Sequence, residues 1–141
     1  MVAVAIVSAA CSNDSNSTVT PPTSTTDILS GTLNAPVNGL AQTAISPFTV
    51  GQSGGTVQVT LTSAVETLPG GTLLPTVTVG LAVGTFSGGA CSVISTSFTP
   101  ASGGSNPQIS GSLTAGNYCV IVSDIIGLAG PVSYALAVTH P

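Results

Sequence analysis

The chain of 141 residues contains no lysine, no arginine and no tryptophan, and it has only four acidic residues and one histidine. A typical soluble domain is about one quarter charged. Because no cationic side chain can neutralise phosphate groups, the composition excludes nucleic-acid binding and electrostatic docking on anionic lipids. With three Phe and two Tyr as the only aromatic residues, small aliphatic side chains must fill the core. The length fits a single domain.

The N-terminal residues 1–10 are apolar and lead directly to Cys11, after which the sequence turns polar. This pattern predicts an export signal, although the usual basic segment is missing. The stretch from Val7 to Cys11 resembles the lipobox of bacterial lipoproteins, which implies that Cys11 is lipidated and becomes the mature N-terminus. The alternative is that residues 1–10 form a first strand or short helix of the fold. They are too few for a transmembrane helix, which needs about 20 residues.

Residues 12–27 are rich in Ser and Thr and contain Val19 as their only aliphatic residue. Such a segment has nothing to bury, so we expect a flexible tether. The predicted organisation is a signal-like segment over residues 1–10, a lipidated cysteine and tether over residues 11–27, and one folded domain over residues 28–141.

If Cys11 carries lipid, Cys91 and Cys119 remain as a pair. Disulfides form and persist in exported proteins, so we expect these two residues to be bonded. The alternative is a pair of buried free thiols. A zinc site is disfavoured because structural zinc requires four ligands and His140 is the only imidazole in the chain.

From Ile28 onward, apolar residues alternate with Thr, Ser and Gln, which is the period of a β-strand. Gly-Gly and Gly-Pro pairs separate the alternating runs and indicate turns. The sequence therefore predicts an all-β fold, an antiparallel β-sandwich or jelly roll of about eight strands. The candidate strands are residues 28–34, 44–50, 56–63, 75–83, 92–98, 108–113, 117–124 and 132–139.

The C-terminal third contains the runs LTAGNYCVIV over residues 113–122 and YALAV over residues 134–138. Together they look like the closing strands of bacterial pre-peptidase C-terminal domains, and with the upstream strands the similarity covers residues 28–140. The resemblance implies a small β-sandwich of an exported protein. That domain usually accompanies a hydrolase, so the resemblance does not imply catalysis by the domain itself.

Outside the tether, the acid–base inventory is Glu66, Asp124, His140 and two Tyr. A Ser/His/Asp site would need His140 to be buried and oriented by Asp124, whereas we expect an exposed imidazole near the chain end. A two-carboxylate glycosidase would need Glu66 and Asp124 to face each other across a cleft. We expect Glu66 to be a solubilising loop residue, because it precedes a Pro-Gly-Gly turn. The sequence thus predicts no catalytic residues, metal or cofactor.

The first functional hypothesis is a non-enzymatic, lipid-anchored module of the bacterial cell envelope or cell surface. Its partners would be the membrane, through the lipid on Cys11, and an envelope protein or polysaccharide. The second is a self-assembling subunit of an extracellular layer or fibre, because edge strands without lysine tend to add further strands. The third is a glycan-binding module, which the absence of Trp and the core parity of Tyr118 and Tyr134 disfavour.

Overall fold

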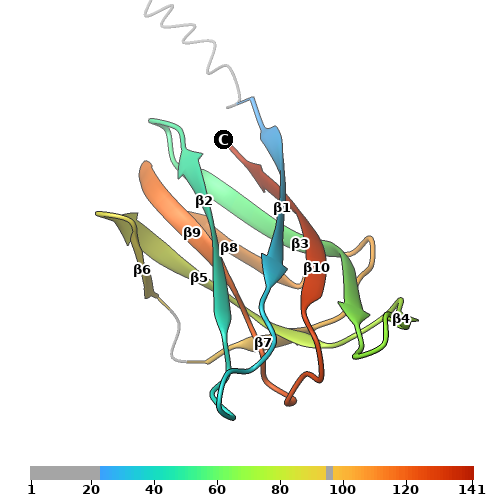
Figure 1. The fold of residues 1–141 in the computed structure, drawn as a ribbon. Coiled ribbons are helices and arrows are strands. Elements are labelled where there is room, and N and C mark those ends of the chain that lie inside the picture. Colours follow the sequence, from blue (N-terminus) through green and yellow to red (C-terminus); the bar gives the residue numbers. More distant parts are fainter. Residues whose placement is uncertain (1–22, 95–96) are drawn as a thin grey trace, which may run out of the picture.

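Two antiparallel sheets pack face to face in the computed structural model, which describes residues 23–94 and 97–141 (Figure 1). These residues form ten strands and no helix, so the expected all-β sandwich is confirmed. Cys11 and the signal-like segment lie outside the described residues. Within the described part of the chain, no helix is long and apolar enough to cross a membrane.

The first sheet has the order β1-β10-β3-β4, and β8 also pairs with β3. Its strands are β1 (Thr25–Leu33), β3 (Gly55–Thr67), β4 (Leu73–Leu74), β8 (Ile109–Leu113) and β10 (Val132–His140). The second sheet has the order β2-β9-β5-β6, and β7 also pairs with β5. Its strands are β2 (Thr43–Val50), β5 (Val79–Ser87), β6 (Ala90–Val93), β7 (Thr99–Ala101) and β9 (Gly116–Ser123).

Three of the predicted boundaries are wrong. The tether was expected to continue to Asp27, but β1 begins at Thr25 and pairs with β10 along its whole length. The candidate strand over residues 75–83 is displaced, because β5 starts at Val79 and continues to Ser87. The candidate strand over residues 92–98 overlaps only the end of β6, which stops at Val93, and β7 begins at Thr99 and pairs with a different part of β5.

The core lies between the sheets and consists mainly of Val and Leu side chains at alternating strand positions. Tyr118 in β9 and Tyr134 in β10 are both buried, as their parity predicts. The hydroxyl groups of Tyr134 and Ser46 lie 3.0 Å apart. This buried hydrogen bond joins β10 of the first sheet to β2 of the second and satisfies both polar groups.

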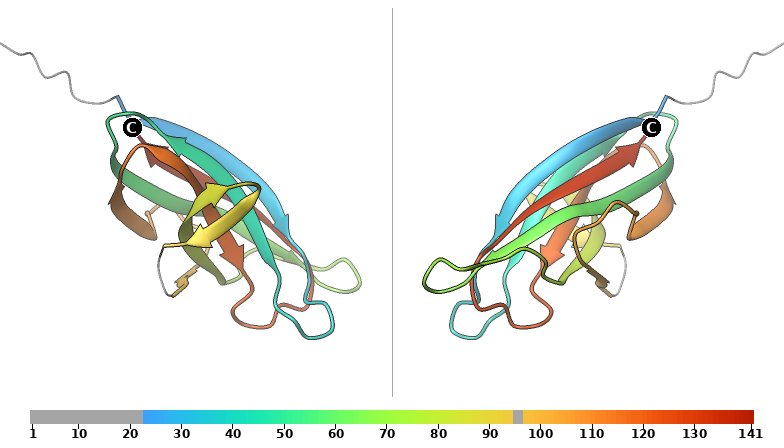
Figure 2. Two further views of the ribbon diagram at one scale, coloured as in Figure 1. Left: turned by 90° about the vertical axis from the view of Figure 1, so that its left-hand side faces the viewer. Right: turned by 90° about the vertical axis from the view of Figure 1, so that its right-hand side faces the viewer.

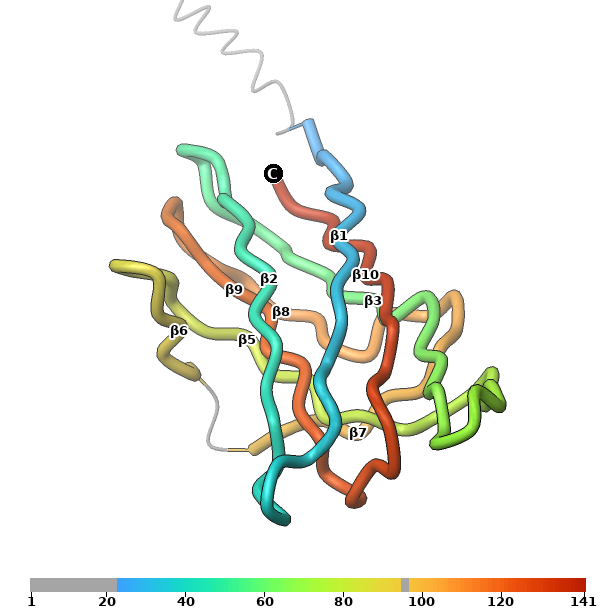
Figure 3. The backbone as a smooth tube through the Cα atoms, viewed as in Figure 1, coloured from blue at the N-terminus to red at the C-terminus, as the bar shows by residue number. Residues whose placement is uncertain are grey.

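The two ends of the sandwich carry different parts of the chain (Figures 2 and 3). β1 begins where β10 ends, because Thr25 pairs with His140. The β1–β2 and β9–β10 loops lie together at the opposite end (Figure 2). A tether that precedes β1 therefore attaches at the end of the domain away from these two loops.

Candidate functional site

His140 is buried and pairs with Asp27, which corrects the expectation of an exposed imidazole. Its Nε2 lies 3.0 Å from Oδ2 of Asp27 in β1, and its Nδ1 lies 3.1 Å from the backbone oxygen of Pro141. Asp124 is at the other end of the sandwich, in the β9–β10 connection (Figure 1). Asp124 therefore does not orient His140, and the His140–Asp27 pair instead ties β1 to β10.

Asp124 and Glu66 are both buried and hold the loop between β9 and β10. Oδ1 of Asp124 accepts hydrogen bonds from the backbone N–H groups of Ile126 and Gly127, at 3.1 and 2.8 Å. Oδ2 accepts one from Leu128 at 3.0 Å. The loop over residues 124–131 thus begins with an acidic residue, and the carboxylate of this residue accepts hydrogen bonds from the backbone of the same loop.

Glu66 completes this arrangement from β3, which corrects its expected role as an exposed loop residue. Its Oε1 accepts hydrogen bonds from Ala129 N at 2.6 Å and Gly130 N at 2.9 Å. With Asp124, the two carboxylates accept the N–H groups of all residues from 126 to 130. Both acids therefore have a structural task in positioning one loop.

The neighbouring β1–β2 loop is held in a tight turn by its own backbone hydrogen bonds. Val37 and Leu40 exchange backbone hydrogen bonds of 3.2 and 2.9 Å. Between them, Asn38 and Gly39 have φ angles of 52° and 75°. An Asn-Gly pair with two positive φ angles is typical of the type I′ turn, whose twist suits a tight hairpin. Val37 and Leu40 are thus held at fixed positions on the loop tip.

Exposed aliphatic side chains gather on these two loops. Val37 and Leu40 are 55% and 69% exposed, and Ile125 and Ile126 are 40% and 59% exposed. We call these four residues the distal patch. Burying one such side chain against a partner contributes about 1.5–3 kcal/mol, so the distal patch offers a substantial driving force for association.

The two loops are joined to each other. The backbone N–H of Asp124 donates a hydrogen bond of 3.2 Å to the carbonyl oxygen of Gln42. Between the loops lies a hollow of about 480 Å³. It is lined by Pro36, Gly39, Ala41, Asp124, Ile125, Gly127 and Leu128. Of the distal patch, Ile125 lines this hollow, and the other three residues lie on the same two loops.

The backbone N–H groups of the β9–β10 loop can be desolvated at a low cost in free energy. An N–H group that loses water without gaining a partner costs about 1–3 kcal/mol. Here the carboxylates of Asp124 and Glu66 already accept the N–H groups of residues 126–130. Desolvating those groups therefore costs little free energy when a partner covers this loop. Since both carboxylates are buried, they add no exposed charge to the distal patch.

Cys91 and Cys119 form the expected disulfide, with their Cα atoms 6.0 Å apart. The bond joins β6 to β9, the strands on either side of β5. A Cβ atom on Gly84 of β5 would lie 2.5 Å from the carbonyl oxygen of Ser92 and 2.9 Å from Sγ of Cys91. Glycine at position 84 is therefore what lets β6 approach closely enough for the bond.

Within residues 23–94 and 97–141, no group of three or more His, Cys, Asp or Glu residues is placed to hold a metal ion. Comparisons with protein-family models, curated proteins and solved structures found no match to this chain. The resemblance to pre-peptidase C-terminal domains and to lipoproteins thus stays a prediction.

The distal patch was missed by the sequence reasoning, although two signals for it are present. Asn38-Gly39 between Val37 and Leu40 is a strong hairpin signal, and it places two aliphatic residues beside a solvent-exposed turn. Ile125 and Ile126 are consecutive and lie just before Gly127. Turns are normally polar, so aliphatic residues beside two turns indicate an exposed apolar patch.

Proposed function

We propose that this chain is a non-enzymatic binding module that is anchored to the bacterial cell envelope by lipid on Cys11 and docks through the distal patch. The observation that carries the proposal is the exposure of Val37, Leu40, Ile125 and Ile126 on two hydrogen-bonded loops. These loops lie at the end of the sandwich away from the start of β1 (Figure 2). An anchor that precedes β1 leaves the distal patch free to meet a partner away from the membrane.

The partner that fits the distal patch is an apolar protein surface of the envelope. Aliphatic side chains provide burial but no aromatic face on which a sugar ring could stack, which disfavours a polysaccharide. The chain has no lysine or arginine, and Asp124 and Glu66 are buried. Few charges are thus available for screening, so we expect the affinity to change little with salt concentration.

We propose that the chain is not an enzyme because its ionisable side chains already make hydrogen bonds within the fold. Glu66 and Asp124 accept backbone hydrogen bonds, and His140 pairs with Asp27 at the other end of the sandwich. A general acid or base must be free to reach a substrate proton. Each of these groups has instead a role in joining strands or holding a loop.

Self-assembly through a strand edge is the second candidate. β1 is the outer strand of its sheet, and Ile28 on it is 71% exposed. An unprotected edge of this kind can add a strand from another chain. We favour docking through the distal patch over strand addition at β1, because β1 already contacts β2, the edge strand of the other sheet.

The lipid anchor is tested by replacing its attachment site with Cys11→Ser. A lipid chain contributes about 0.8 kcal/mol per buried methylene group, which the polar residues after Cys11 cannot replace. We therefore expect the native chain to partition into detergent and the Cys11→Ser chain to appear in the aqueous phase. Intact mass spectrometry of the native chain should show acylation at Cys11 and no Met1.

A native chain that retains Met1, or a Cys11→Ser chain with an unchanged distribution between the phases, would contradict the anchor. Ser12→Ala is the matched control, because it alters the adjacent residue and leaves the thiol in place. This control should partition like the native chain.

A further inference from the structure

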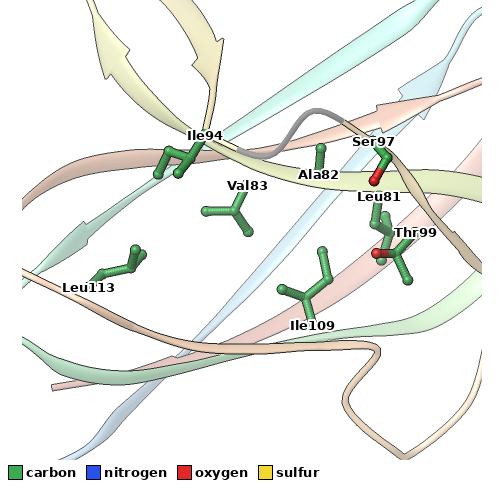
Figure 4. A pocket seen from close by; sticks show the side chains of 8 residues that line it. All are labelled: Leu81, Ala82, Val83, Ile94, Ser97, Thr99, Ile109 and Leu113. Atoms are coloured by element: carbon green, nitrogen blue, oxygen red, sulfur yellow. The ribbon is translucent and has the colours of Figure 1, made fainter.

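A second apolar feature lies between the two sheets, on the side where β8 faces β5 (Figure 4). The hollow has a volume of about 160 Å³. It is lined by Leu81, Ala82, Val83, Ile94, Ser97, Thr99, Ile109 and Leu113. A smaller hollow of about 60 Å³ shares Val83, Ile109 and Leu113 with it and adds Val57 and Gly111. We call the two hollows together the intersheet groove.

Gly111 leaves the smaller of the two hollows unfilled. Side chains alternate along a strand, so positions 109, 111 and 113 of β8 share one face. Ile109 and Leu113 line both hollows, and between them Gly111 contributes no side chain. A Cβ atom built at Gly111 would meet no atom within 4 Å, and φ at this residue is outside the positive range that favours glycine. The backbone therefore accepts a larger residue here.

Glycine inside a strand weakens it, because it adds backbone entropy to the unfolded chain and packs nothing. Such a glycine often marks a place where a ligand approaches closely. At positions 84 and 31, close packing explains the glycine, because a Cβ atom at either position would collide with a neighbour. Gly111 has no such neighbour, and its effect in the fold is to extend the groove by the smaller hollow.

The lining determines what the groove can hold. Figure 4 shows Leu113 at one end and the hydroxyl-bearing residues Ser97 and Thr99 at the other, with aliphatic side chains between them. Among the described residues, no charged side chain lines either hollow. An ionised ligand would therefore lose its hydration without gaining a partner. An apolar cavity of roughly 150 Å³ is large enough to bind a molecule such as benzene.

We infer that the intersheet groove binds the aliphatic chain of an uncharged, single-chain amphiphile, with the polar end of the ligand at Thr99. The hydroxyl group of Thr99 can exchange hydrogen bonds with an alcohol, ester or amide. The chain of the ligand would then lie along Val83 and Ile109 toward the space left by Gly111. This inference does not depend on docking through the distal patch, which lies on other loops.

The test uses the full chain with Cys11→Ser, which needs no detergent, and the probe is n-hexanol. For so small a ligand we expect a dissociation constant on the order of 1 mM. In methyl NMR spectra, n-hexanol should shift the signals of Val83, Ile109 and Leu113. The signals of Val37 and Leu40 in the distal patch should stay unchanged. Hexanoate, which has the same chain length and an ionised head, should bind at least about tenfold more weakly.

Gly111→Val is the matched variant, because its methyl groups would occupy the open space in the groove. We expect n-hexanol binding to weaken by about tenfold or more, while the melting temperature equals or exceeds that of the parent chain. Ser112→Val adds the same side chain to the opposite face of β8 and should leave binding unchanged. In the parent chain, shifts confined to other methyl groups, or no saturable shift at all, would overturn the inference.

Two further results would also overturn it. Undiminished binding to Gly111→Val would show that the ligand lies elsewhere, and hexanoate binding as tightly as n-hexanol would contradict an uncharged ligand. If Gly111→Val does not fold, the methyl shifts of the parent chain and the comparison with hexanoate still decide the question.

Discussion

Asp124→Ala is expected to lower the free energy of unfolding by about 3–5 kcal/mol, because it removes the acceptor of three backbone N–H groups, one buried and two partly buried. Asp124 accepts the N–H groups of Ile126, Gly127 and Leu128, and its own side chain is buried. Urea denaturation of the variant beside the parent chain measures the change directly.

Asp124→Asn is the graded control, because it keeps one oxygen acceptor and turns the other into a donor. It should lose an intermediate amount of stability. Asp27→Ala removes a half-exposed acid whose side chain hydrogen-bonds to His140, so its effect should be smaller. A loss for Asp124→Ala below about 0.5 kcal/mol, as at an ordinary surface site, would contradict the role of this carboxylate in holding the loop.

Removing the disulfide is expected to have a comparable effect. The bond links residues separated by 28 positions, which on the chain-entropy account stabilises the fold by about 3–4 kcal/mol. The paired substitution Cys91→Ala with Cys119→Ala should therefore lower the melting temperature by about 10–20 °C. Calorimetry of the variant and of the parent chain, oxidised and reduced, measures this difference.

The reduced parent chain and the alanine pair should melt at similar temperatures, since both lack the cross-link. Peptide mapping without reductant should recover Cys91 joined to Cys119. Ready alkylation of both thiols in the native, unreduced chain would be incompatible with the bond.

The sequence predicted the strands well where one face of a strand is buried. In β10, alternation from Val132 to Val138 places every second side chain in the core, and the structure agrees. The split between β6 and β7 could not be predicted, because alternation does not reveal where a chain leaves one part of β5 and joins another. Similarly, Gly84 was expected to lie beyond the end of a strand, whereas it is the point at which β6 packs closely on β5.

The charged residues were misjudged for a different reason. Asp27 pairs with His140 across 113 positions, and Glu66 binds Ala129 across 63 positions. Contacts at such separations leave no periodic signal. The composition nevertheless contains a clue, because a buried carboxylate in a chain without Lys or Arg must be satisfied by backbone N–H groups, hydroxyl groups, Asn or Gln amides, or His140.

Binding to isolated envelopes tests the central claim most directly, with the Cys11→Ser chain used so that lipid makes no contribution. Leu40→Ser combined with Ile126→Ser removes two exposed side chains of the distal patch. Ile28→Ser combined with Leu73→Ser is the matched control, because it removes two exposed aliphatic residues from β1 and β4. We predict that the distal-patch pair weakens binding by about tenfold or more, while the control pair binds like the parent chain. Equal binding by the distal-patch pair and the parent chain, or a loss only in the Ile28 and Leu73 pair, would contradict docking through the distal patch.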